Sequence, residues 1–293
     1  MARLKSKPWE LSEVARNVHV FRFDIKSSTD WHQDFLLMAD EHWDNPQCKW
    51  DLLKRHHEEA RERNAPILKF GDLFCAMQGS WDPRKSKSKL RPEHQVDNYL
   101  DALVETGVDW YEPWMDLIAL VCPGNHEESI VKRHETDLID RFCQRLQDRG
   151  GVCRRGGYGG YVKFQVRVHG TKNSSLKMYY HHGFGGGGPV TKGTIDFNRY
   201  SEMAEADIYV AGHVHRKNLN EQRRWRLTEQ NVVKQRRIHY VRVGTYKDEA
   251  DDCFSGGYHN QRGRGPRPLG GYWMRLTYKE LKGGLIAEFR SAD

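Results

Sequence analysis

Short apolar runs that end in turn residues mark the first half of the chain. They cover residues 35–39, 66–70 and 116–122. Runs of this length, bounded by Gly, Pro, Asp or Asn, are typical of buried strands. The segments 50–63 and 93–105 between them are rich in charge, which predicts surface helices. Strand, helix and strand at these intervals predict a mostly parallel sheet.

After about residue 150 the pattern changes to apolar and polar side chains in alternation. Residues 161–168 follow this period of two, as a half-exposed strand does. Two glycine-rich loops, 183–188 and the Gly/Arg-rich loop 256–271, interrupt the later part. We interpret this half as a second sheet with more antiparallel pairing. Its other predicted strands are 177–182, 207–211, 238–243, 272–277 and 285–289.

The composition is that of a folded protein with a packed core. Of 293 residues, 38% are hydrophobic and 11% aromatic, which excludes disorder throughout. No apolar run reaches the roughly 18 residues of a membrane-spanning helix, so we expect no membrane partner. Six cysteines without a CxxC pair favour reduced thiols in the cytoplasm over a zinc ribbon. We expect a single cytoplasmic domain over residues 1–293.

Side chains that can bind metal follow the predicted strands. Asp40 and His42 come after the first strand, Asp72 after the second and Asn125 after the third. In open α/β sheets, sites form beyond the carboxyl ends of the strands, so these groups should converge. The later strands add imidazoles at their ends: His181, His182, His213 and His215.

The number of these donors favours a pair of metal ions. Seven ligands from five segments are too many for a closed structural zinc site, which takes four. Two ions about 3.5–4 Å apart would use them all and leave open positions. Asp72 is the natural bridge, because its carboxylate can lie between two dications. Mixed imidazole and carboxylate donors suit Mn, Fe, Zn or Ni, so we expect two divalent ions of undetermined identity.

These motifs occur in the order found in the calcineurin-like metallophosphoesterases, and the chain resembles that superfamily over about residues 35–216. GNHE and GHxH are the specific pieces. The resemblance implies an α/β fold of four layers, a two-sheet sandwich flanked by helices. The motifs are Asp40-Glu41-His42, Gly71-Asp72, Gly124-Asn125-His126-Glu127, His182-Gly183 and Gly212-His213-Val214-His215.

The resemblance also implies a role for each ligand. The first metal would take Asp40, His42, Asp72 and His215, and the second would take Asp72, Asn125, His182 and His213. His126 would contact the phosphate and assist the leaving group, while Asn125 would also bind substrate. A metal pair lowers the pKa of bound water, which makes hydroxide available for hydrolysis near neutral pH. Proton donation by His126 would contribute about 10²–10⁴-fold.

Some assignments have alternatives. Asp30 and His32 repeat the D-x-H spacing, but Asp40 and His42 directly follow an apolar run and are favoured. His181 and His182 point to opposite faces of a strand, so only one should enter the site. The superfamily's ligand precedes Gly, which favours His182.

Two cysteines lie near the motifs, and the motifs differ from those of two related branches of the superfamily. Cys75 and Cys122 lie beside motif residues, and we interpret them as small buried side chains rather than ligands. Glu127 stands where the repair-nuclease branch commonly has Asp, and Cys75 stands where an acidic residue is often found. Protein Ser/Thr phosphatases carry GDxxDRG, whereas GDLFCAM here lacks the second Asp and the Arg.

Positive charge is concentrated in one segment. Lys and Arg total 47 against 40 Asp and Glu, a net charge of +7. Residues 216–242 hold nine basic and two acidic residues, with Trp225 and Tyr240 among them. A basic wall that guides a polyanion to the metals fits this pattern, and so does a solvated hairpin without a partner. Arg223, Arg224 and Arg226 are the candidate substrate contacts.

The sequence therefore predicts a binuclear metal phosphoesterase. The favoured substrate is a phosphate diester in DNA or RNA, which would make the protein a phosphodiesterase or nuclease, with manganese as one candidate metal. Two alternatives remain: a phosphomonoesterase acting on a nucleotide or small molecule, and a non-catalytic nucleic-acid-binding protein.

Overall fold

The structure is a computed structural model that describes residues 7–26, 31–76, 90–170, 172–186, 188, 195–250, 265–279 and 284–293. Asp30 and residues 256–264 of the predicted Gly/Arg-rich loop lie outside these ranges. Among the residues within them, no helix is long and apolar enough to cross a membrane.

One sheet contains the strands that carry the first ligands. It consists of six strands, in spatial order β13 (Gly284–Ser291), β12 (Tyr272–Lys279), β3 (His32–Met38), β4 (Ile67–Phe70), β5 (Ile118–Cys122) and β6 (Arg154–Arg155). β3, β4 and β5 are parallel to one another, which confirms the predicted strand-helix-strand arrangement. β12 lies antiparallel to β3, and β13 lies antiparallel to β12.

The other sheet is mixed. It consists of seven strands, in spatial order β1 (Glu10–Ala15), β2 (Val18–Ile25), β7 (Gly159–Val168), β8 (Lys172–His181), β9 (Ile208–Ala211), β11 (Val233–Arg242) and β10 (Asn218–Leu227). β9 lies parallel to both β8 and β11, while β7 with β8 and β10 with β11 form antiparallel pairs.

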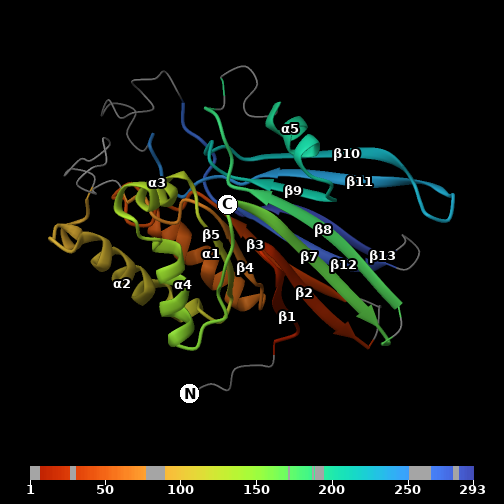
Figure 1. Ribbon diagram of the computed structural model, residues 1–293, viewed down its shortest axis with the longest axis horizontal. Coiled ribbons are helices and arrows are strands. Elements are labelled where there is room, and N and C mark those ends of the chain that lie inside the picture. The colour runs from red at the N-terminus through yellow and green to blue at the C-terminus, as the bar shows by residue number, and fades with distance from the viewer. Residues whose placement is uncertain are drawn as a thin grey trace.

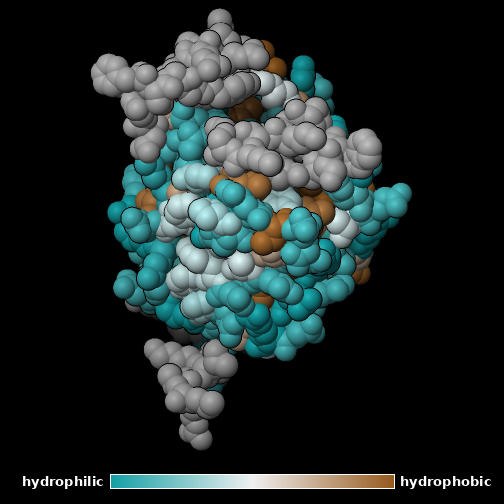
Figure 2. All heavy atoms as spheres, turned by 90° about the vertical axis from the view of Figure 1, so that its left-hand side faces the viewer, coloured by the Kyte–Doolittle hydropathy of each residue, from teal (hydrophilic) through white to brown (hydrophobic). Residues whose placement is uncertain are grey.

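Helices cover the outer faces of the two sheets (Figure 1). Four α-helices pack on the six-stranded sheet, and α5 (Ile195–Met203) packs on β9 and β11 of the other. The four are α1 (Trp50–Glu62), α2 (Tyr99–Tyr111), α3 (Asn125–His134) and α4 (Leu138–Asp148), with the 3₁₀ turns η2 (Pro92–His94) and η3 (Glu112–Trp114). Seen from the helical end, the described surface is mostly hydrophilic, with apolar residues in small groups (Figure 2).

The alternation of side chains along β3 explains how the layers hold together. Leu36 and Met38 pack against the helices, whereas Phe35 and Leu37 belong to the core between the sheets. Phe35 meets Phe164 of the other sheet edge to face, with ring centroids 4.9 Å apart. This helix–sheet–sheet–helix arrangement confirms the predicted fold class.

The prediction was wrong about which sheet the terminal strands join. Residues 272–277 and 285–289 were predicted for the second sheet, but β12 and β13 extend the first one at the free edge of β3. The second sheet is instead extended by β1 and β2 from the N-terminal part. The β12–β13 pair and the β1–β2 pair both contribute side chains to the core between the sheets. The alternation of apolar and polar residues shows which face of a strand is buried, but it does not show which strand lies next to it.

One predicted helix differs from the structure at both ends. The helix predicted over 50–63 is α1, but the helix predicted over 93–105 is α2, which runs from Tyr99 to Tyr111. The 3₁₀ turn η2 occupies the start of the predicted segment, and the backbone of α2 begins after Asn98. Charge content therefore identified the helix but not its first or last residue.

Two buried neutral histidines of α1, His56 and His57, should make the fold sensitive to acid. Nδ1 of His57 lies 2.7 Å from the Leu53 carbonyl oxygen and donates to it, so Nε2 accepts from the Lys69 ammonium at 3.1 Å. Burial and Lys69 hold the pKa of His57 well below its ordinary value, and burial lowers the pKa of His56 to about 4. Below about pH 6.5, the unfolded chain therefore binds protons that the folded chain does not.

We expect stability to be lost as the pH falls from 7 to 5, by about 1.4 kcal/mol per pH unit for each such histidine. His57→Gln should lower the free energy of unfolding at pH 7 but make its pH slope shallower by about one proton. Urea unfolding at several pH values measures both quantities. An unchanged slope in the variant would show that His57 is not the titrating group.

Candidate metal centre

The predicted ligands meet at one end of the two sheets. Each follows the carboxyl end of a strand: β3, β4, β5, β8 or β9. All seven are buried or half-buried. The structure thus brings together Asp40, His42, Asp72, Asn125, His182, His213 and His215.

Five of these residues have a left-handed backbone, with φ between 46° and 71°. They are Asp40, His42, Asp72, His213 and His215. This conformation costs a residue with a side chain about 1–2 kcal/mol, so hydrogen bonds from the surroundings must hold it. The amide of Asp40 donates to the Gly71 carbonyl at 2.9 Å, and the amide of His42 donates to the Asp72 carbonyl at 3.0 Å. Strain gathered at one place in this way marks a functional site.

The first donor group contains Asp40, His42 and His215. The Nε2 atoms of His42 and His215 face each other at 3.1 Å. Nε2 of His215 lies 3.4 Å from Oδ1 of Asp40. The other oxygen of Asp40 accepts from the His213 amide at 2.8 Å, which leaves Oδ1 for the cluster.

The second donor group contains Asn125, His182 and His213. Oδ1 of Asn125 lies 2.7 Å from Nδ1 of His213 and 3.1 Å from Nε2 of His182. Nδ1 of His182 donates to the Phe70 carbonyl at 2.9 Å, so this ring presents Nε2 to the cluster.

Asp72 joins the two groups. Its Oδ2 atom lies 3.4 Å from Nε2 of His182 and 4.0 Å from Nε2 of His42. The neighbouring imidazoles hold the pKa of Asp72 well below its ordinary value, and Asp72 raises the pKa of His182 to about 10. In contrast, burial and the rings of His126 and His215 hold the pKa of His42 well below its usual range.

Two glycines allow this close packing. A Cβ atom on Gly124 would lie 2.1 Å from Oδ1 of Asp72, and a Cβ on Gly71 would lie 2.2 Å from Nδ1 of His182. Gly71 also has a φ of +99°. The glycines of the GD and GNHE motifs are therefore required by the space that the ligands occupy.

The donors fit a pair of divalent metal ions. Donor atoms that bind one ion at about 2.0–2.2 Å lie roughly 3–4 Å apart. The donor pairs within the two groups lie 2.7–3.4 Å apart, which is close to that spacing. Oδ1 of Asp40 and Nδ1 of His42 are buried without a hydrogen-bond partner. A buried polar atom is costly unless something binds it, and a cation would satisfy the carboxylate oxygen.

His126 stands beside the cluster with one ring nitrogen directed by the backbone. Nδ1 lies 2.6 Å from the Cys75 carbonyl oxygen, so it carries a proton and donates. Nε2 then faces the cluster, 3.8 Å from Oδ2 of Asp72. Asp44 accepts from the amides of Cys75 and Ala76 at 2.5 and 3.0 Å and so fixes this carbonyl.

The thiol of Cys75 is close enough to be considered as a ligand. A ligand atom of Cys75 lies within 4.8 Å of those of His42 and His126. Burial and the Asp44 carboxylate raise the pKa of the Cys75 thiol to about 12. Asn45 also donates to its sulfur at 3.3 Å. Cys122 is buried at the end of β5 and its thiol pKa is raised by burial.

Glu127 fastens the loop that carries Asp72. It lies in the first turn of α3, is buried and accepts three backbone hydrogen bonds. Its carboxylate accepts from the amides of Phe74 and Gly124 at 2.8 Å and of Asp72 at 3.2 Å. One carboxylate therefore links the GD and GNHE motifs.

A buried ion pair that sequence reasoning missed lies directly behind the first ligands. Nζ of Lys69 lies 2.7 and 2.8 Å from the two carboxylate oxygens of Glu41. The Tyr111 hydroxyl donates to the same carboxylate at 2.6 Å, and His57 accepts from Lys69. Two signals could have revealed this pair: a lysine inside the apolar run 66–70, and a glutamate between two ligands that must point away from them.

Of the adjacent histidines, the structure brings His182 into the cluster and leaves His181 outside. Nδ1 of His181 accepts from the Gly183 amide at 3.0 Å. Its ring packs against Tyr158, Phe184 and Tyr200.

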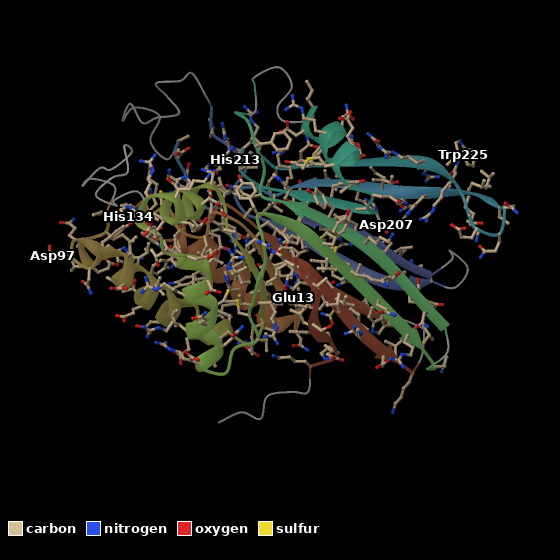
Figure 3. All side chains as sticks on the ribbon, in the orientation of Figure 1. Glu13, Asp97, His134, Asp207, His213 and Trp225 are labelled. Carbon is tan, nitrogen blue, oxygen red and sulfur yellow. The ribbon has the colours of Figure 1, made fainter. Side chains whose placement is uncertain are left out.

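The structure does not bring Arg223, Arg224 and Arg226 to the cluster. All three lie on β10, and Trp225 between them is far from His213 (Figure 3). Other basic side chains lie closer: Arg267 donates to the Val214 carbonyl at 2.5 Å, and buried Arg242 donates to the Gly212 carbonyl at 3.1 Å. These two support the loop of the GHVH motif, and no local sequence pattern indicates that role.

No protein-family model and no curated protein matches the chain. Solved structures match most of its length with low similarity. The calcineurin-like phosphoesterase YfkN from Bacillus subtilis has 12% identity and a TM-score of 0.34, covering 89% of this chain and 91% of that one. A metallophosphoesterase from Sphaerobacter thermophilus has 11% identity and a TM-score of 0.36, and the match covers 88% of this chain and 89% of that one. Vps29 from Chaetomium thermophilum has 10% identity and a TM-score of 0.37, and the match covers 88% of this chain and 95% of that one.

Two of these three structures are described as phosphoesterases, of the superfamily whose motif order this chain resembles. The identities and TM-scores are too low to assign an activity to the chain. Its function has to be inferred from the side chains of the cluster.

Proposed function

We propose that the protein is a metal-dependent phosphoesterase that hydrolyses phosphate esters at this cluster. The observation that carries the proposal is the convergence of two donor groups on one carboxylate, Asp72. Asp40, His42, Asp72 and His215 would hold one ion, and Asp72, Asn125, His182 and His213 would hold the other. When bound, such a pair lowers the pKa of water and offsets charge that develops on a phosphoryl group.

His126 is the proposed proton donor to the leaving oxygen. The Cys75 carbonyl accepts from Nδ1 in both the neutral and the protonated ring, so the ring keeps its orientation when it gains a proton. Nε2 faces the space in front of the donors and would release that proton there. Asn125 has its oxygen among the donors and would help to hold the phosphate next to His126.

The finer proposal is a phosphodiesterase or nuclease, with manganese among the candidate metals. The net charge of +7 supports a polyanionic substrate. A phosphomonoesterase has the same ligand chemistry and differs only in the substrate that fits. The non-catalytic alternative would bind nucleic acid without hydrolysing any ester.

Metal removal and replacement test the proposal. The protein is stripped with a chelator, reloaded separately with Mn²⁺, Fe²⁺, Zn²⁺ or Ni²⁺, and assayed with a bis-aryl phosphodiester and an aryl monophosphate. We expect the stripped protein to be inactive and at least one metal to restore hydrolysis, with the diester preferred. Preference for the monoester would favour the phosphomonoesterase. Metal binding without turnover of either ester would overturn the enzymatic proposal.

A further inference from the structure

The basic arm, defined as residues 218–242, is a two-stranded ribbon that extends from the seven-stranded sheet. β10 and β11 pair over ten rungs, but β11 pairs with β9 only from His239 to Arg242. Among the strands that the structure describes, none lies beside the distal half except its own partner, and almost every residue of β10 is exposed. Figure 1 shows the arm leaving the sheet, and Figure 3 shows Trp225 far from His213.

Like charges face each other on this distal half. Arg223 is paired with Arg237, Arg224 with Arg236 and Arg226 with Lys234. Like charges directly opposite each other on two strands are destabilising. Three such rungs among four successive ones are unfavourable in the free protein, and a bound polyanion would remove the repulsion.

Neighbouring acids neutralise only part of this charge. Glu205 and Asp207 pair with Arg236, Glu205 also pairs with Arg226, and Glu221 pairs with Arg237. Within the part of the chain that the structure describes, no carboxylate forms an ion pair with Arg223, Arg224 or Lys234. Trp225, exposed at 72%, adds a large apolar ring between the arginines.

The charge is distributed over both faces of the ribbon. Residues two apart share a face and cross-strand partners point the same way, so Arg224, Arg226, Lys234 and Arg236 lie on one face. Arg223 and Arg237 lie on the other. A ribbon that rests on a flat anionic surface needs charge on one face only. A ribbon inside a groove with a phosphate backbone on each side needs it on both, and the major groove of duplex DNA admits such a ribbon.

We propose that the basic arm binds duplex DNA by entering its major groove, at a distance from the metal cluster. Binding of DNA by the arm does not depend on the proposed function, whereas hydrolysis of the bound DNA does. Arg223 and Arg226 lie about 17–27 Å beyond Asn218 along the strand. A duplex therefore has to be longer than about 8 base pairs, at about 3.4 Å each, to extend from the arm to the cluster.

Binding of a fluorescent 30-base-pair duplex at several salt concentrations tests the proposal. The triple variant R223A/R224A/R226A is compared with R141A/R145A/R149A on and directly after α4, which removes the same charge from arginines that are paired with acids. We expect the arm variant to bind more weakly, with a slope of log K against log salt that is shallower by about 2–3. The α4 variant should keep the wild-type slope.

Several results would overturn the proposal. One is an arm variant with the slope of the wild type. Another is equal loss of affinity for single-stranded DNA, and a third is tighter arm-dependent binding to vesicles of anionic lipid than to duplex. Because like charges are removed, the arm variant should melt no lower than the wild type, so unfolding is checked separately. Hydrolysis of the small diester by the wild type decides the proposed function independently of these affinities.

Discussion

Asp72→Asn is expected to reduce metal-dependent hydrolysis of a small phosphate ester by about 10²–10⁴-fold, equivalent to the several kcal/mol that a metal centre contributes to stabilising the charged transition state. Asp72 lies between the two donor groups, with Oδ2 3.4 Å from Nε2 of His182 and 4.0 Å from Nε2 of His42. An amide is uncharged and cannot offset two dications. The metal content per protein, measured by mass spectrometry, should fall together with the rate.

The fold should survive this substitution. Oδ1 of Asp72 accepts from the His126 amide at 3.0 Å, and the oxygen of Asn can do the same. Asp34→Asn is the matched control, since Asp34 is also buried but pairs with Arg275 and Arg63, away from the cluster. The control should lose some stability and keep its metal. Full activity and full metal content in Asp72→Asn would refute the role of Asp72 as a shared ligand.

Breaking the Glu41–Lys69 pair is expected to cost about 3–5 kcal/mol of folding free energy, because it leaves an uncompensated charge in the core. Both side chains are about 1% exposed. In Glu41→Met the ammonium of Lys69 would lose both carboxylate oxygens and keep, among the described residues, His57 and the sulfur of Met38 as acceptors. In Lys69→Met the carboxylate of Glu41 would keep only the Tyr111 hydroxyl.

The double variant E41M/K69M should be more stable than either single variant, since apolar residues of similar volume often replace a buried ion pair at little cost. Urea unfolding of all four proteins gives the coupling energy. Glu59→Ala breaks the exposed contacts of Glu59 with Arg55 and Arg63 and should change stability by less than about 1 kcal/mol. If the losses of stability in E41M and K69M simply add in E41M/K69M, the Glu41–Lys69 pair has no coupling energy and the prediction is wrong.

The sequence predicted best those strands that are buried on both faces. β3, β4 and β5 are continuous apolar runs because the helices cover one side and the second sheet covers the other. β10 is absent from the predicted strands, although a solvated hairpin was one interpretation of residues 216–242, because it is exposed on both faces and has no apolar alternation. The alternation in β2 was a usable signal, with Phe21 and Phe23 in the core between the sheets.

For the site, the sequence predicted the groups that would bind metal but not those that hold them in place. The candidate ligands could be named because imidazole and carboxylate groups are unusual at the ends of buried strands. The supporting groups form hydrogen bonds or ion pairs with partners that only folding brings close. They are Asp44, Glu127 and the Glu41–Lys69 pair. Lys69 is 28 residues from Glu41 in the chain, and Asp44 is 31 from the Cys75 amide that it accepts from. No local pattern encodes such partners.

The position of β12 has a consequence for the synthesis of the protein. β3 leads directly to Asp40 and His42, yet its neighbour on one side is β12, more than 230 residues later in the chain. A ribosome therefore releases all seven ligands before the edge of β3 is covered. Until residues 272–279 emerge, that edge has unpaired backbone groups that can join strands of other nascent chains. Metal capture at the finished centre should accordingly follow translation, and chains stalled before β12 should depend on chaperones.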